Sequence, residues 1–230
     1  LMTLFWFLFS CTNTESSLLN KLYFVEVSIE NFAENSATLP FSATPVEQTL
    51  AVRTLDGNGE EFPFTGDLKV HVRPGQLAAD QDPWLSIENG SIIDTDKIVR
   101  YQAAFGPTRI WLSDEGDKDA SSEREPTFAT GVTEILNYEF PTISQFNKTT
   151  DDNGDALIQN TTNHLVQEFT EIQLENRDVI ATVVSTNGFW VTDIESQQQA
   201  EDGGYASLYI YTFQKPTGVV PGSRFTRLMG

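Results

Sequence analysis

The sequence predicts a mainly β protein made of short strands, in the order of a β-sandwich followed by a partial β-barrel. Thr, Val, Ile and Phe are frequent, which favours strands over long helices, and Gly and Pro are scattered along the chain as turn formers. Apolar and polar residues alternate in short segments, separated by turn residues at roughly 8–12 residue intervals. A hydrophobic content of 39%, with 11% aromatic residues, is sufficient for packed cores in 230 residues.

The charge is strongly acidic, with 33 Asp and Glu against 14 Lys and Arg and a formal net charge of −19. Phosphate backbones are bound through clustered Lys and Arg, so this balance disfavours nucleic acid as a partner. It is typical of a solvated acidic surface, with loose binding of divalent cations as the alternative.

The first eleven residues suggest an exported protein. Residues 1–10 are nearly all apolar but fall short of the about 20 needed to span a bilayer. The letters LFSC, ending at Cys11, resemble the lipobox of a bacterial lipoprotein signal. That resemblance implies lipidation of Cys11 and anchoring at the outer membrane or cell surface, while a buried strand or the end of a longer apolar segment is the alternative. Residues 12–38 are rich in Ser and Thr at their start and are expected to form a flexible tether.

Residues 39–116 predict the β-sandwich. Apolar residues alternate with polar ones in EQTLAVRTLDG and GDLKVHVRPG, and WLSIENGSI contains Asn89-Gly90, a hairpin signal. Leu68, Val70 and Val72 alternate with polar neighbours, so His71 is expected on the polar face of a strand. We interpret it as a surface histidine.

This segment resembles the Ig-like domains of exported bacterial proteins, through FPFTGDLKVHVRPG and the later AAFGPTRIWLSDEG. The GPTRIW strand is also similar to one in surface lipoproteins of δ-proteobacteria of the predatory and soil type. The resemblance implies an Ig-like fold and a surface location, and no activity.

Two acidic loops are candidates for a metal site. In LDGNGEEFPFTGD, Asp56, Asn58, Glu60 and Asp67 have an EF-hand-like spacing, but Glu61 occupies the position that requires Gly. We interpret this loop as a β-turn and residues 151–155 as a solvated loop. We therefore expect no metal site and no cofactor.

Residues 117–140 are expected to form an acidic linker, and residues 141–230 a second β module. Within residues 166–230, the segments VIATVVST, GFWVTD, YASLYIYTF and PGSRFTRLMG resemble the OB-fold module of bacterial extracellular nucleases. An OB-fold barrel has about five strands, more than this segment provides, so we expect the module to be truncated. Nothing here matches the nuclease catalytic domain.

An aromatic stripe in this module raises the main functional question. Tyr209, Tyr211 and Phe213 share one face of a predicted strand, opposite Leu208 and Ile210. With Trp190, they form either part of a core or domain interface, or a platform on which ligand rings stack. Because residues 141–230 hold eleven acidic and five basic residues, we expect packing rather than nucleic-acid binding.

No pattern predicts catalysis. His164 has no G-x-S-x-G partner, and no phosphate-binding loop or dinucleotide glycine pattern is present. Acidic residues are abundant, so a carboxylate pair for glycoside hydrolysis remains open. We expect an exported, lipid-anchored, non-enzymatic surface protein with a structural role or a protein or glycan ligand. The alternatives are an OB-type binder of single-stranded nucleic acid or oligosaccharide, and the accessory region of a larger hydrolase.

Overall fold

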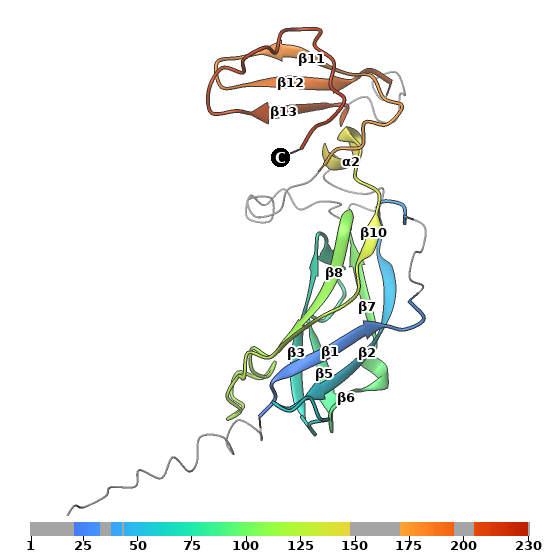
Figure 1. Cartoon of the computed structure of the whole chain (residues 1–230), viewed down its shortest axis with the longest axis vertical. Coiled ribbons are helices and arrows are strands. Elements are labelled where there is room, and N and C mark those ends of the chain that lie inside the picture. Colours follow the sequence, from blue (N-terminus) through green and yellow to red (C-terminus); the bar gives the residue numbers. More distant parts are fainter. Residues whose placement is uncertain (1–20, 33–37, 43, 148–170, 196–204, 230) are drawn as a thin grey trace, which may run out of the picture.

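The computed structural model describes residues 21–32, 38–42, 44–147, 171–195 and 205–229. In these residues the chain is mainly β, with antiparallel strands in two sheets, neither of which is closed into a barrel (Figure 1). The larger sheet forms a sandwich-like unit, here called the sandwich. Its strands are β1 (Phe24–Ile29), β2 (Val46–Leu55), β3 (Gly66–Arg73), β4 (Gln76–Leu77), β5 (Trp84–Glu88), β6 (Ser91–Ile92), β7 (Ile98–Gln102), β8 (Gly106–Ser113), β9 (Thr130–Val132) and β10 (Leu136–Tyr138).

The sandwich folds one hydrogen-bonded sheet back over itself. One layer contains β1, β2, β7 and β4, and the other contains β5, β3 and β8, with β9 and β10 pairing with β8. Strand β6 joins the layers because it pairs with both β5 and β2. The core therefore lies between the layers, while each layer keeps an outward face.

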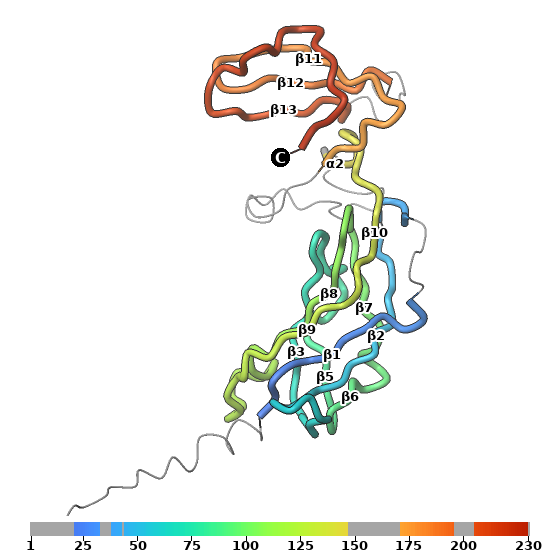
Figure 2. Tube along the Cα trace, viewed as in Figure 1, coloured from blue at the N-terminus to red at the C-terminus, as the bar shows by residue number. Residues whose placement is uncertain are grey.

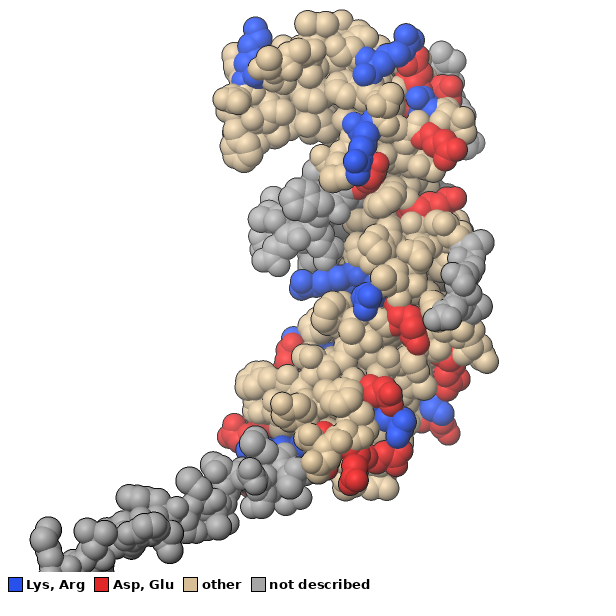
Figure 3. Space-filling model, in the orientation of Figure 1, with Lys and Arg blue, Asp and Glu red and all other residues tan. Residues whose placement is uncertain are grey.

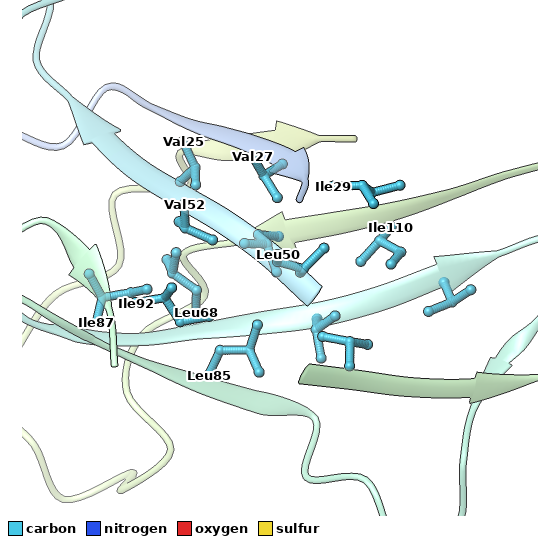
Figure 4. Close-up of a cluster of buried hydrophobic side chains, with 14 of the residues drawn as sticks. Val25, Val27, Ile29, Leu50, Val52, Leu68, Leu85, Ile87, Ile92 and Ile110 are labelled. Carbon is cyan, nitrogen blue, oxygen red and sulfur yellow. The ribbon is translucent and has the colours of Figure 1, made fainter. Parts of the chain in front are cut away.

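Alternation along β3 and β8 builds this core. On β3, Leu68, Val70 and Val72 are buried, and on β8, Ile110 and Leu112 are buried. These side chains meet those of β1 and β2 between the layers (Figure 4). Because successive side chains of a strand point to opposite faces, the intervening residues are turned outward. His71 is one of these, which confirms its predicted place on the polar face.

Strand β1 corrects the expectation that residues 12–38 form a flexible tether. Residues 24–29 pair along their whole length with residues 50–55 of β2. On its other side β1 runs beside β9 (Figure 2). A Cβ on Gly131 would lie 2.1 Å from the carbonyl oxygen of Val25, so only glycine permits this close approach.

The expected acidic linker at 117–140 is likewise incorporated into the sandwich. It contains β9 and β10, and Arg124 lies between the carboxylates of Asp114 and Asp117. Asp114 is fully buried and accepts two hydrogen bonds from the Arg124 guanidinium, at 2.8 and 3.0 Å, and one from the backbone amide of Thr127. The carboxylate of Asp117 accepts a bond from the amide of Asp67 on β3. Asp114 and Asp117 are therefore structural, because they fix the loop to the sheet.

Two turn predictions are confirmed. Asn89 and Gly90 join β5 to β6 with φ angles of 50° and 86°, as a two-residue type I′ hairpin requires. In the EF-hand-like loop, Asp56 Oδ1 accepts hydrogen bonds from the amides of Asn58 and Glu60, which forms a tight turn. Asp67 is bonded elsewhere, to Ser86 and the amide of Lys118. No cluster of metal-ligating side chains occurs in the described part of the chain.

A cluster of aromatic side chains joins the sandwich to the rest of the chain. Phe41 and Phe105 are buried in it, and Phe140 and Phe146 pack against them. Phe146 lies on the short helix α2 (Ile143–Asn147) and also contacts the core of the second sheet. Helix α2 therefore lies between the two units (Figure 1).

Three predicted features lie outside the residues that the structure describes: the lipobox with Cys11, the loop at 151–155 and His164. Within the described ranges, no helix has the length and hydropathy needed to cross a bilayer.

The Asp114–Arg124 pair makes the stability of the sandwich sensitive to acid. Burial opposes ionisation of Asp114, but the hydrogen bonds from Arg124 and Thr127 outweigh it and hold the pKa of Asp114 below its usual 3.8. A lowered carboxyl pKa contributes stability above the usual value, and this contribution is lost as pH falls through the folded-state pKa.

We predict that Arg124→Ala lowers the free energy of unfolding at pH 7 by about 3 kcal/mol, because it leaves a buried carboxylate without its cation. The difference from wild type should shrink below about pH 4, as Asp114 of the variant protonates. Urea unfolding at pH 7 and pH 3 measures both effects. Arg224→Ala, which removes an exposed ion pair, is the control and should change little. A deficit of equal size at both pH values would contradict the assigned role.

Candidate ligand-binding face

The second unit is a three-stranded antiparallel sheet, here called the C-terminal sheet. Its strands are β11 (Val179–Val184), β12 (Gly188–Asp193) and β13 (Ser207–Tyr211), in that order. One face covers a core, against which Leu208 and Ile210 pack. The buried members of this core are Ile143, Ile172, Val179, Ala181, Phe189, Val191 and Leu228.

The aromatic stripe lies on the opposite, outward face. Trp190 on β12 is directly opposite Tyr209 on β13, with ring centroids 5.2 Å apart. Trp190 is 44% exposed and Tyr211 55%. The structure therefore corrects the expectation that these rings fill a core: period-two alternation places Phe189 and Val191 inside and Trp190 outside. We call Trp190, Tyr209, Tyr211 and Phe213 the aromatic face.

Tyr209 is held in a defined position on this face. Its ring lies over Gly188, where a Cβ would come within 2.7 Å of the ring and 2.3 Å of the carbonyl oxygen of Ile210. Its hydroxyl donates to Asn187 Oδ1 at 2.9 Å and lies 3.3 Å from Ser185 Oγ. The turn between β11 and β12 thus orients the ring, so that little side-chain freedom remains to be lost on binding.

Phe213 extends the face beyond the end of β13. Its ring is 86% exposed and contacts that of Tyr211, with centroids 4.7 Å apart. The backbone of Phe213 has φ 62°, in the left-handed region that a bulky side chain rarely adopts. Strain of this kind costs about 1–3 kcal/mol and is concentrated at functional sites.

A row of hydroxyl groups runs beside the aromatic rings. Thr192 Oγ1 lies 2.8 Å from Ser207 Oγ and 3.3 Å from Thr182 Oγ1, so the row crosses all three strands. On β11, Val183 lies opposite Trp190 and is 54% exposed. Thr192 itself is buried, so the face offers flat apolar surface next to the hydroxyl groups of Thr182 and Ser207.

Positive charge near this face is largely neutralised. Residues 171–230 contain four Lys and Arg residues, and the three arginines are each paired with a carboxylate. The pairs are Arg177–Asp193, Arg224–Asp178 and Arg227–Glu171. Figure 3 shows a broad area of the C-terminal sheet without Lys, Arg, Asp or Glu. These residues do not provide the continuous row of cations that a phosphate backbone requires.

The sequence identified the four rings but missed their polar surroundings. No sequence motif includes Ser185, Asn187 or Thr192. Alternation from Trp190 does place Thr192 on the same face of the strand. The candidate lipidation residue Cys11 lies outside the described residues.

No family model matches the chain, and comparison with curated proteins and with solved structures finds no match.

The placement of the rings predicts that two adjacent substitutions lower stability by very different amounts. Phe189→Ala should lower the free energy of unfolding by about 3–5 kcal/mol, because it leaves a cavity in the core. Trp190→Ala should cost at most about 1 kcal/mol, because it removes only a cross-strand contact on the outward face. Chemical unfolding followed by far-UV circular dichroism measures both. If Trp190→Ala were as destabilising as Phe189→Ala, the outward placement would be wrong.

Proposed function

We propose that this protein is a non-enzymatic binding protein of the cell exterior, and that its aromatic face holds an uncharged oligosaccharide. The observation that carries the proposal is the row of exposed rings on β12 and β13, ending in the strained and 86% exposed Phe213. Exposed rings at adjoining positions are seldom left on a soluble surface without a function.

The chemistry of the face suits a saccharide. The C–H faces of a pyranose pack on aromatic rings, and Trp and Tyr supply rigid contact area at low entropic cost. Sugar hydroxyls exchange hydrogen bonds with hydroxyl and amide groups, which the row at Thr182 and Ser207 and the side chain of Asn187 provide. Nucleic acid would stack equally well but would meet paired arginines and a net charge of −19.

We also propose a fold family for each unit and a location for the protein. The sandwich of β1–β10 is proposed to be Ig-like, and the C-terminal sheet to be part of an OB-like module. The lipobox ending at Cys11 supports export and anchoring through an N-terminal lipid, which would display the aromatic face outside the cell.

We predict retention of the protein by at least one neutral soluble polysaccharide in affinity electrophoresis against β-glucan, xylan and mannan. Trp190→Ala and Tyr211→Ala should each weaken this binding by about 2 kcal/mol, as truncation of an anchoring ring does. Phe213→Ala should also weaken it. Phe128→Ala is the matched control, since Phe128 is 72% exposed at φ 57° but lies in the sandwich.

Two results would reject the saccharide proposal: unchanged retention of all three variants, or tight and salt-sensitive binding of a dT20 oligonucleotide that requires the same rings. Retention should be compared among variants that have wild-type circular dichroism.

The location has its own test. When the complete gene is expressed in a Gram-negative host, we expect the intact mass of the product to show a diacyl- or triacylglyceryl group on a chain that begins at Cys11. Cys11→Ala should abolish the modification. An unmodified wild-type chain that retains residues 1–10 would refute the lipid anchor and leave the saccharide proposal untouched.

A further inference from the structure

A second exposed tryptophan lies on the outward face of the sandwich. Trp111 on β8 is 42% exposed and is directly opposite His71 on β3. Further along β8, Ser113 points to the same face and is directly opposite Thr130 on β9. These four residues, with Glu115 and others, line a shallow groove of about 350 Å³. The groove belongs to the sandwich, whereas the aromatic face belongs to the C-terminal sheet.

The polar side of the groove is built around the carboxylate of Glu115. It forms an ion pair with Lys69 at 2.8 Å and accepts a hydrogen bond from Ser113 Oγ at 3.0 Å. His71 Nε2 lies 3.3 Å from Glu115 Oε1 and also 3.3 Å from Ser113 Oγ. The hydrogen bond from Lys69 holds the pKa of Glu115 below its usual value, so at neutral pH this side chain is ionised and only accepts hydrogen bonds.

The charge of this carboxylate is balanced by Lys69, but its capacity to accept hydrogen bonds is not exhausted. An ionised carboxylate has about four acceptor sites, and the contacts with Lys69, Ser113 and His71 use fewer than that. The hydroxyl of Thr130 can donate or accept, and the ring of Trp111 adds an apolar wall. The groove therefore suits an uncharged ligand that places a donor and an acceptor next to an apolar ring face.

We propose that this groove binds an oligosaccharide of N-acetylated amino sugars. The acetamido group of such a sugar is uncharged and carries an N–H donor beside a carbonyl acceptor. The N–H donates to the carboxylate of Glu115, the carbonyl oxygen accepts from the hydroxyl of Thr130, and the C–H face of the pyranose packs on Trp111. The site is separate from the aromatic face, takes a different class of sugar and does not depend on the function proposed for that face.

The test is calorimetric titration of the whole protein with tetra-N-acetylchitotetraose and with cellotetraose, which has the same linkage but hydroxyl groups in place of the acetamido groups. Both titrations are also made on Trp190→Ala, in which the aromatic face contributes little. This variant should bind tetra-N-acetylchitotetraose at least about tenfold more tightly than cellotetraose, because cellotetraose leaves the polar groups of the groove without their partners.

Two further substitutions, each added to Trp190→Ala, locate this binding in the groove. Trp111→Ala should weaken it at least about tenfold, as loss of an aromatic anchor does. Glu115→Gln should weaken it by about tenfold, because it removes the charge-assisted hydrogen bond. Glu47→Gln is the matched control, since it also removes a carboxylate from an exposed ion pair, with Arg100, but on β2. It should leave the affinity unchanged.

Circular dichroism and thermal unfolding identify variants that remain folded. The proposal for the groove would be overturned if Trp190→Ala failed to bind tetra-N-acetylchitotetraose, or if neither Trp111→Ala nor Glu115→Gln weakened that binding. Equal affinity of Trp190→Ala for the two tetrasaccharides would also overturn it, because the acetamido group would then not be recognised. Retention by neutral polysaccharides that is lost in Trp190→Ala tests only the proposal for the C-terminal sheet.

Discussion

The ladder between β3 and β8 is the interaction on which the sandwich depends. Its inward side chains, such as Val70 opposite Leu112, lie in the core, and β5, β9 and β10 each pair with one of these two strands. The same hydrogen bonds bring His71 opposite Trp111 on the outward side. Since one register fixes both faces, a slip by one residue would exchange the core side chains with the outward ones.

The C-terminal sheet also has one buried and one outward face, with different side chains on the outward one. Phe189 and Val191 of β12 are buried, and Trp190 between them is displayed with Tyr209. Here the outward groups are rings and hydroxyls, whereas the sandwich displays a ring beside cations.

The large negative charge has two roles in this molecule. Most carboxylates are solvated, but Asp114 and Asp193 are fully buried and each is held by one arginine, at 2.8 Å from Arg124 and 2.6 Å from Arg177. The first pair fixes the loop after β8, and the second joins the segment before β11 to the end of β12. A buried carboxylate needs such a partner, because its loss leaves an uncompensated charge in a poorly solvating interior. Composition alone does not distinguish these two acids from the solvated ones.

The sequence by itself determined several of the strands and which of their residues share a face, because alternation is a local property. It predicted β11, β12 and β13, the Asn89-Gly90 hairpin and the outward place of His71, and it singled out the four rings of the aromatic face. It did not determine which face of β13 would be covered, since either face of an isolated strand can meet a core.

Only the tertiary structure decided the contacts between distant segments. In the structure, β1 lies in the sandwich beside Gly131, and the acidic segment around Arg124 is hydrogen-bonded to β3. Trp111 on β8 lies directly opposite His71 on β3. Those contacts join residues far apart in the chain, and they depend on which sheets pack together, so no local pattern of residues encodes them.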